Sequence, residues 1–146
     1  MNIKEFRDKN QNKKKVFTNG CFDILHRGHI SYLNEAKALG DILVVGVNSD
    51  VSVKKLKGDS RPINNEEDRL FVLENLKAVD KCFIFTEETP YNLINELMPN
   101  ILVKGGDWKV EDIVGSDIVM KNGGNVYSLN FIDGFSTTNV IEKIKK

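Results

Sequence analysis

Residues 18–29, Thr-Asn-Gly-Cys-Phe-Asp-Ile-Leu-His-Arg-Gly-His, are the stretch that decides the fold of this chain. They follow a short apolar run that begins at Lys15, and they lead into a helical pattern that begins near Gly28. Asn19-Gly20 permits a tight turn, which lets backbone amides approach a ligand closely. The unpaired amides and the positive dipole end of a helix N-terminus favour an anion at such a place. The stretch therefore predicts a strand, a turn and a helix that together form an anion site.

Further apolar runs, separated by helical patterns, continue this unit towards the C-terminus. The runs predict strands over residues 15–18, 42–47, 81–85, 101–104 and 126–129. Their nearly continuous apolar character suits strands that are covered on both faces, as in a parallel sheet. The alternation predicts an α/β fold, a doubly wound, Rossmann-like open parallel sheet with helices on both faces and right-handed crossovers. Such sheets bind ligands at the carboxyl ends of their strands, where the strand order switches.

Capping residues and apolar spacing place helices between these strands. We expect helices that begin near residues 28, 64, 89 and 136. Asn64 starts the second helix, with Glu67 three residues on as its capping-box partner. Thr89 caps the third helix, and Pro90 takes its first helical position, where the missing N–H leaves no bond unmade.

Composition bounds the class of protein. The chain has 146 residues, of which 40% are hydrophobic and 29% charged, and 21 basic residues balance 21 acidic ones. We expect a single domain over residues 1–146, without a broad surface for nucleic acid or an anionic membrane. Apolar runs such as 42–45 fall far below the roughly 18 residues of a spanning helix, and residues 1–15 contain no apolar signal core. Cys21 and Cys82 form no CxxC pair, so we expect reduced thiols in a cytoplasmic protein.

His26 and His29 are the only histidines of the chain, three positions apart across Gly28. At a helix start this spacing aims both imidazoles in a similar direction, and the glycine leaves room for a phosphate against the backbone. For an isolated HxxH pair, the simpler interpretation is one histidine that hydrogen-bonds in the core and one that is exposed. A metal site with Cys21 or Asp23 is a further alternative, although transition-metal sites usually show more Cys and His clustering. The order strand, glycine turn, Phe-Asp and HxGH favours phosphate binding.

Charged residues follow the second predicted strand. Lys55 and Lys57 lie in a predicted loop that Gly58 interrupts, and lysine point charges suit a triphosphate. A solvated basic loop is the alternative for two lysines taken alone. Asp50 is expected to cap the next helix unless it also orients a ligand. Arg69 lies on the second predicted helix. Taken alone, it is expected to form a surface ion pair with a neighbouring Glu.

Two more clusters follow later strands. Lys104-Gly105-Gly106-Asp107-Trp108 offers a charge, a close backbone approach and an acceptor for sugar hydroxyls. A hairpin-like turn with a packed Trp108 is the alternative. Ser136-Thr137-Thr138 opens the last helix and offers hydroxyls and free amides to a phosphate. A helix cap explains Ser136 but not the two threonines.

These segments resemble the HxGH nucleotidyltransferase superfamily and, within its cytidylyltransferase-like branch, the adenylyltransferases that form ADP-heptose. The resemblance spans about residues 15–144 and is carried by residues 18–23, 26–29, 47–50, 55–58, 61–64, 67–69, 103–107 and 134–138. It implies in-line transfer of AMP from ATP to D-glycero-β-D-manno-heptose 1-phosphate, with release of pyrophosphate. It also implies a homodimer, and Mg²⁺ that arrives with the ATP and is held largely by phosphate oxygens and water.

The resemblance further implies a role for each site residue. The phosphates and the leaving group are assigned to His26, His29, Lys55 and Lys57. The nucleotide is assigned to Thr18, Asn19, Gly20, Cys21, Phe22, Gly28, Ser136, Thr137 and Thr138. The sugar-phosphate side is assigned to Asp23, Asp50, Arg69, Lys104, Gly105 and Asp107. No residues are assigned to a resident metal.

One departure from the branch directs the choice of substrates. Cytidylyltransferases that act on glycerol phosphate typically carry an arginine shortly before the glycine of the final block, whereas residues 130–134 here are Asn-Phe-Ile-Asp-Gly. This favours ATP and a heptose phosphate. The bifunctional heptose enzymes carry a sugar kinase ahead of this domain, and we expect none fused here, the kinase being a separate protein. The competing hypotheses are a cytidylyltransferase for glycerol or ethanolamine phosphate and a nucleotide-binding scaffold without turnover.

Overall fold

The structure, a computed structural model, describes residues 1–131 and 134–146. At its centre is one sheet in which all neighbouring strands are parallel. The strands are β1 (Lys15–Gly20), β2 (Ile42–Asn48), β3 (Lys81–Phe85), β4 (Ile101–Gly105) and β5 (Asn125–Leu129). Their order across the sheet is β3-β2-β1-β4-β5, which confirms the predicted doubly wound fold. The order switches between β1 and β4, where sheets of this class open a crevice.

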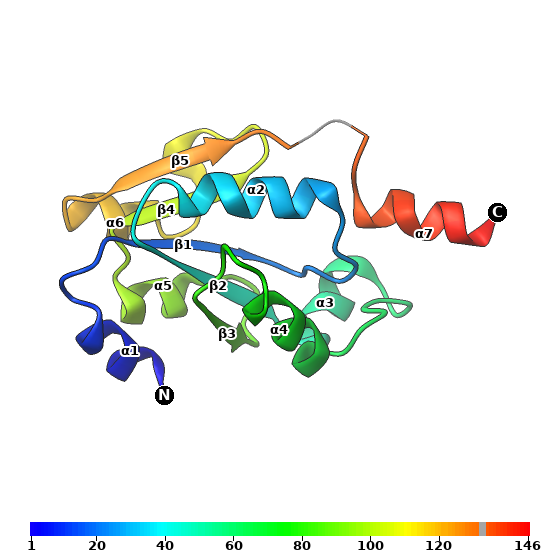
Figure 1. The fold of residues 1–146 in the computed structure, drawn as a ribbon, viewed down its shortest axis with the longest axis horizontal. Helices are drawn as coiled ribbons and strands as arrows, with labels where there is room; N and C mark the ends of the chain where they lie inside the picture. The colour runs from blue at the N-terminus through cyan, green and yellow to red at the C-terminus, as the bar shows by residue number, and fades with distance from the viewer. Residues whose placement is uncertain (132–133) are drawn as a thin grey trace.

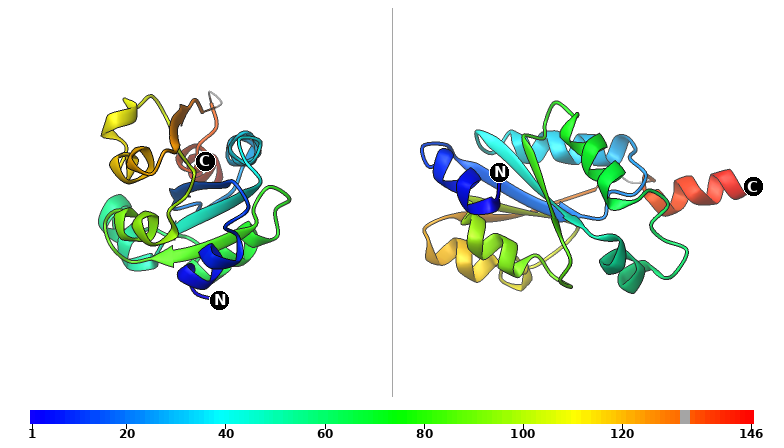
Figure 2. Two further views of the ribbon diagram at one scale, coloured as in Figure 1. Left: turned by 90° about the vertical axis from the view of Figure 1, so that its left-hand side faces the viewer. Right: turned by 90° about the horizontal axis from the view of Figure 1, so that it is seen from below.

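Helices cover both faces of this sheet (Figures 1 and 2). They are α1 (Ile3–Lys9), α2 (Arg27–Lys37), α3 (Asp50–Lys57), α4 (Glu66–Glu74), α5 (Tyr91–Leu97), α6 (Ser116–Lys121) and α7 (Thr137–Lys145), with a 3-10 helix, η1 (Val110–Asp112), before α6. In Figure 1 the strands run towards the end of the molecule where α3 and α7 lie, and α7 projects beyond the body there. Within the described residues, no helix has both the length and the apolar character required to cross a bilayer.

Alternation along the strands divides the apolar side chains between two cores. Val16 of β1 belongs to the core that contains Leu33 of α2, whereas the next residue, Phe17, belongs to the core that contains Ile94 of α5. Because successive side chains of a strand point to opposite faces, each central strand contributes to both cores. The helices therefore hold the sheet from both sides and leave the carboxyl ends of its strands uncovered by core packing.

The elements match the sequence expectation best where the sequence signal is long. All five predicted strands are confirmed, with ends shifted by at most two residues. The predicted capping box at Asn64 is wrong, because Asn65 caps α4 and accepts a hydrogen bond from the Asp68 N–H at 2.8 Å. Pro90 is the N-cap of α5 rather than its first helical residue. Helices α1 and α6 were not expected, and α3 was expected only through a cap at Asp50, since six to eight residues show little periodicity.

Candidate functional site

A cavity of about 640 Å³ opens at the carboxyl ends of β1 and β4, at the switch in strand order. This volume lies within the usual range of small-molecule sites. The lining comes from the ends of both strands, the N-termini of α2 and α7, the end of α3 and the loops after β3 and β4. The lining residues that the sequence analysis assigned to the site are Asn19, Gly20, Cys21, Phe22, Asp23, His26, Gly28, His29, Lys57, Lys104, Gly105, Ser136, Thr137 and Thr138.

The other assigned residues do not line this cavity in the described part of the chain: Thr18, Asp50, Lys55, Arg69 and Asp107. Thr18 is fully buried, and its hydroxyl lies 2.7 Å from that of Tyr32. The loop predicted around Lys55 is wrong, because Ser49 caps α3 and the lysine is an exposed residue of that helix. Asp107 is exposed beyond the turn that follows β4.

The two histidines form the first turn of α2 and point the same way, as predicted. His26 is the N-cap, and its Nδ1 accepts a hydrogen bond from the Gly28 N–H at 3.1 Å. His29 Nδ1 accepts one from the His26 N–H at 3.3 Å. The ring centroids are 4.0 Å apart, with 33° between the ring planes. Because Nδ1 is the acceptor in both rings, the neutral form of each ring carries its proton on Nε2 and can donate from there.

Burial keeps both imidazoles uncharged at neutral pH. It lowers the pKa of His29 to about 4, with a further contribution from neighbouring His26, and it also lowers the pKa of His26. The Nε2 atom of His26 is buried and has no hydrogen-bond partner among the described residues. An unpaired buried donor is costly. A ligand oxygen at this position would therefore be bound favourably.

The turn between β1 and α2 is built differently from the predicted one. Asn19 and Gly20 are the last residues of β1, and it is Phe22 that takes the left-handed conformation, with a φ of 49°. This conformation is uncommon outside glycine. Gly20 is needed for packing, because a Cβ there would lie 2.9 Å from the Phe22 ring. The Phe22 ring is buried, and its centroid lies 5.4 Å from that of the His29 ring. It therefore packs against one side of the imidazole.

Asp23 anchors the segment that follows α3 to this turn. Its carboxylate is buried and accepts hydrogen bonds from the backbone N–H groups of Ile63 at 2.8 Å and Asn64 at 2.9 Å. Arg61 Nε donates to it at 3.0 Å. Three donors satisfy the buried charge, which would otherwise be strongly unfavourable. Asp23 is thus engaged by its own chain at the edge of the cavity.

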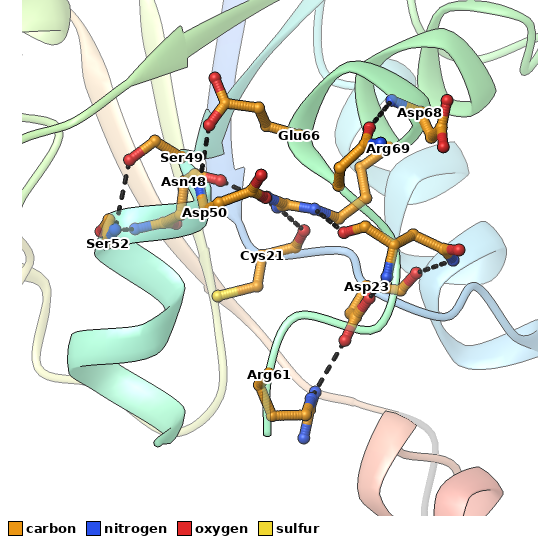
Figure 3. Close-up of polar contacts among 12 residues, drawn as sticks. Cys21, Asp23, Asn48, Ser49, Asp50, Ser52, Arg61, Glu66, Asp68 and Arg69 are labelled. Carbon is orange, nitrogen blue, oxygen red and sulfur yellow. Dashed lines mark hydrogen bonds and ion pairs between the residues drawn. The ribbon is translucent and has the colours of Figure 1, made fainter. Parts of the chain in front are cut away.

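Arg69 holds together the ends of β1, β2 and α4 from a buried position (Figure 3). Its Nε donates to the Asn64 carbonyl at 2.9 Å, and its Nη1 donates to the carbonyls of Cys21 at 2.7 Å and Asn48 at 2.8 Å. Its Nη2 donates to the Asp50 carboxylate at 2.8 Å. The expected surface ion pair with a neighbouring Glu is therefore wrong, and so is the expected capping role of Asp50, since the preceding serine caps α3.

Basic side chains gather around Cys21 at the end of β1. Lys57, the last residue of α3, and Lys104 of β4 both line the cavity. Burial lowers the pKa of Lys104, whose ammonium lies 5.3 Å from the centre of the Trp108 ring. Burial raises the pKa of the Cys21 thiol, and the positive charges of Lys57 and Arg61 oppose that rise. Trp108 lies against the turn after β4, with its Nε1 donating to the Gly105 carbonyl at 3.1 Å, although 47% of it is exposed.

The start of α7 lies against the turn before α2. Ser136 caps α7, and its Oγ accepts a hydrogen bond from the Asn139 N–H at 3.0 Å. Thr137 Oγ1 donates to the Ile24 carbonyl at 3.0 Å, and Thr138 lines the cavity beside them. The N-termini of α2 and α7 therefore meet at one cavity, where free amides and positive dipole ends favour an anion.

Several lining residues were not assigned to the site from the sequence: Tyr32, Asn48, Leu56, Arg61, Glu88, Thr89, Pro90, Ile113, Val114, Phe131 and Phe135. Phe135 stacks on His26, with 6.2 Å between ring centroids. Phe131 packs on Gly105, where a Cβ would clash with its ring. For Glu88 the available signal was position, since it follows β3 at the carboxyl end of the sheet, whereas Arg61 lies between α3 and α4.

The donor set of the cavity suits phosphate oxygens. No cluster of three or more His, Cys, Asp or Glu side chains placed to hold a metal ion occurs in residues 1–131 and 134–146. Asp23 is already bonded within the chain, and Glu88 is the other lining carboxylate. Imidazole N–H groups and lysines predominate instead. This chemistry fits an Mg²⁺ ion that is carried by nucleotide phosphates better than a cage of protein ligands.

Comparisons with known proteins give this chain a family and relatives. The model of the family described as cytidylyltransferase-like matches residues 17–143. The chain is 63% identical over 137 residues to the bifunctional protein HldE of Haemophilus influenzae strain KW20 / Rd, an alignment that covers 94% of this chain and 29% of the relative. It is 59% identical over 134 residues to the bifunctional protein HldE of Cronobacter sakazakii, covering 92% of this chain and 28% of the relative. The chain thus spans less than a third of the length of these relatives.

Two solved structures share the fold. The lipopolysaccharide core biosynthesis protein of Thermoplasma volcanium superposes with a TM-score of 0.65 at 34% sequence identity, covering 82% of this chain and 97% of that one. The pantothenate synthetase of Thermus thermophilus superposes with a TM-score of 0.61 at 18% identity, covering 94% of this chain and 65% of that one. The second likeness is one of fold alone.

Proposed function

Because the chain belongs to the cytidylyltransferase-like family, we propose that it is a nucleotidyltransferase that moves AMP from ATP to D-glycero-β-D-manno-heptose 1-phosphate. The products are ADP-heptose and pyrophosphate. The observation that carries the proposal is the pair of uncharged imidazoles at the start of α2, which lie 4.0 Å apart and line a cavity shared with Lys57 and Lys104. The heptose acceptor is supported by the identity to HldE and by the likeness to a lipopolysaccharide core biosynthesis protein.

The reaction needs positioning and charge stabilisation more than proton transfer. An oxygen of the acceptor phosphate attacks the α-phosphorus of ATP, the bond to the bridging oxygen breaks, and pyrophosphate leaves with the electron pair. The attacking oxygen is already anionic, so no general base is required. Preorganised donors around the transferring group then lower the barrier.

The chain supplies these donors from fixed elements. His26 and His29 donate from Nε2 to oxygens of the α- and β-phosphates, and they do so as neutral groups because burial lowers both pKa values. Lys57, and Lys55 on the same helix, offset charge on the phosphates and the leaving group. Free amides at the starts of α2 and α7 hold the nucleotide. Lys104 and Gly105 of β4 are assigned to the sugar-phosphate side.

Mg²⁺ is proposed to arrive with ATP, bound through phosphate oxygens and water, where it would neutralise charge on the departing pyrophosphate. The family resemblance supports a cytoplasmic homodimer and the assignment of the whole chain to one nucleotidyltransferase domain. In this arrangement the residues of the chain position the phosphates, and they do not need to form a metal cage.

The preference for ATP and heptose phosphate over CTP and glycerol phosphate rests on the final block of the sequence. Phe131 presents an exposed aromatic ring to the cavity in a stretch where the glycerol-phosphate enzymes typically carry an arginine. Ile132 and Asp133, which belong to the same stretch, lie outside the described residues. A cytidylyltransferase with a phosphoalcohol acceptor is therefore the second candidate, because it would use the same histidines and lysines.

The test is pyrophosphate release with Mg²⁺, measured for ATP or CTP against heptose 1-phosphate or glycerol 3-phosphate. We expect turnover with ATP and heptose 1-phosphate, and a His29→Ala variant that loses turnover with little change in the KM for ATP. Turnover with CTP and glycerol 3-phosphate alone would overturn the substrate assignment. Folded protein that binds ATP but releases no pyrophosphate with any pair would contradict the proposed reaction and favour a binding role.

A further inference from the structure

Arg61 lines the cavity, and among the described residues only one of its three guanidinium nitrogens is hydrogen-bonded (Figure 3). Its Nε donates to Asp23 at 3.0 Å, and 13% of the side chain is exposed. Within the described part of the chain, no hydrogen bond engages either of its terminal nitrogens. An arginine held in this way keeps two N–H-bearing nitrogens available in a planar arrangement that matches a phosphoryl group.

The position of Arg61 is fixed although it lies outside any helix or strand. Its own N–H donates to the Gly58 carbonyl at 3.2 Å, and the N–H groups of Ile63 and Asn64 donate to Asp23. The segment is therefore tied at several points to the turn that follows β1. A preorganised side chain loses less entropy on binding than a free one, so its bonds to a ligand are worth more.

The same turn also holds the start of α7. Thr137 Oγ1 donates to the carbonyl of Ile24, the residue that directly follows Asp23. Arg61 and the N-terminus of α7 are thus anchored on two adjacent residues. Figure 3 shows the outer end of Arg61 directed away from Asp23, on the side where α7 begins.

The charges around Arg61 favour an anion there. Asp23 offsets one positive charge, but Lys57 adds another, since both Lys57 and Arg61 lie close enough to Cys21 to act on its thiol electrostatically. The hydroxyls and amides of Ser136–Thr138 line the same cavity. An arginine fork, a lysine and a helix N-terminus form a donor set suited to more than one phosphate group.

We propose that Arg61 binds the outer phosphates of the nucleotide, those that leave as pyrophosphate, and that Asp23 is the positioning residue that aims it. This inference rests on the proposed function in one respect, namely that a nucleoside triphosphate occupies the cavity. Beyond that function, it makes Arg61 a residue by which the site distinguishes ATP from AMP. The bonds exist before and after the phosphoryl bond breaks, so they contribute to binding of both ATP and free pyrophosphate.

The test compares dissociation constants for ATP, AMP and inorganic pyrophosphate by calorimetry on the full chain with Mg²⁺. We expect Arg61→Ala to weaken ATP and pyrophosphate roughly tenfold to a hundredfold, the usual worth of a charge-assisted pair of bonds, and to leave AMP unchanged. Arg61→Lys keeps the charge without the fork and should fall between. Asp23→Asn should weaken ATP in the same direction by a smaller factor.

Arg27→Ala is the matched control, because Arg27 is an exposed arginine of the same region that does not line the cavity. It should leave all three constants unchanged. Equal losses for ATP and AMP in Arg61→Ala would mean a structural role and overturn the inference, and so would unchanged ATP affinity. If Arg61→Ala fails to fold, Arg61→Lys decides by the same ratio. These are binding measurements, so absent turnover with heptose 1-phosphate would refute the proposed reaction without touching this result.

Discussion

Arg61 and Arg69 lie eight positions apart and serve the same turn, yet the chain uses them in opposite ways. Arg69 is 2% exposed, and its three nitrogens donate hydrogen bonds to three carbonyls and one carboxylate of its own chain. Arg61 donates from one nitrogen to Asp23, and its side chain lines the cavity. Polar groups that the chain satisfies stabilise the fold, whereas those it leaves unsatisfied are available to a ligand. Stability and binding are therefore assigned to different groups within one turn.

The largest expected effect concerns Arg69, the arginine whose nitrogens are all hydrogen-bonded within the chain. Arg69→Met should lower the free energy of unfolding by about 3 kcal/mol or more, because it leaves the buried carbonyl of Asn48 and the partly buried carbonyls of Cys21 and Asn64 without their donor. Urea denaturation followed by circular dichroism measures this loss. The companion variant Asp50→Ala removes only a partly exposed partner and should cost about 1 kcal/mol. An Arg69→Met protein as stable as wild type would erase the contrast between the two arginines.

Sequence reasoning could not have separated these arginines. Arg69 follows Glu66, Glu67 and Asp68 in a charged helix start, a local pattern typical of an exposed face. Its burial depends on Cys21, 48 positions away, and the aim of Arg61 depends on Asp23, 38 positions away. Contacts at such separations leave no local periodicity to read.

What the sequence did predict has local causes. The strands are marked by apolar runs, and the histidine pair by its position after a strand and a glycine. Because parallel strands end at one edge of the sheet, Lys104 and Gly105 could be placed beside the turn after β1. Local composition also explains why Lys55 was wrongly placed in a loop: α3 is a short helix with three lysines in its last turn, and such a segment has the composition of a loop.

A smaller effect should follow from the titration of His29. Burial lowers its folded-state pKa to about 4 from an ordinary value of 6.5, so the unfolded chain binds more protons between these values. The contribution of neutral His29 to stability is therefore complete above pH 6.5 and is lost progressively as the pH falls towards 4. Protonation would also remove the Nδ1 acceptor for the His26 N–H.

The variant that isolates this effect is His29→Gln. Glutamine at this helical position can still accept from the N-cap N–H, as in a capping box, but it does not titrate. Thermal unfolding of both proteins between pH 7 and pH 4 should show a steeper loss for wild type, while losses from carboxylates are common to both. Parallel pH profiles would show that His29 is not held neutral by burial, and its role as an uncharged donor would then have to be abandoned.

The smallest change in stability is expected for His26→Asn. This variant tests whether His26, like Arg61, has a nitrogen that is kept available for a ligand. Asparagine is among the best N-cap residues, so His26→Asn should keep the bond from the Gly28 N–H and remove a buried Nε2 that has no partner among the described residues. Removing the unpaired buried nitrogen should stabilise the fold, and this offsets the loss of stacking on Phe135. We therefore expect a free energy of unfolding within about 0.5 kcal/mol of wild type. Turnover should nevertheless fall roughly a hundredfold, the usual effect of losing one donor to a developing charge. A variant that lost several kcal/mol of stability would place His26 with Arg69 instead, as a group that the fold needs, and one that kept its turnover would leave the orphaned nitrogen without a role in catalysis. Unchanged stability together with a large loss of turnover is the result that distinguishes a group needed for a ligand from a group needed for the fold.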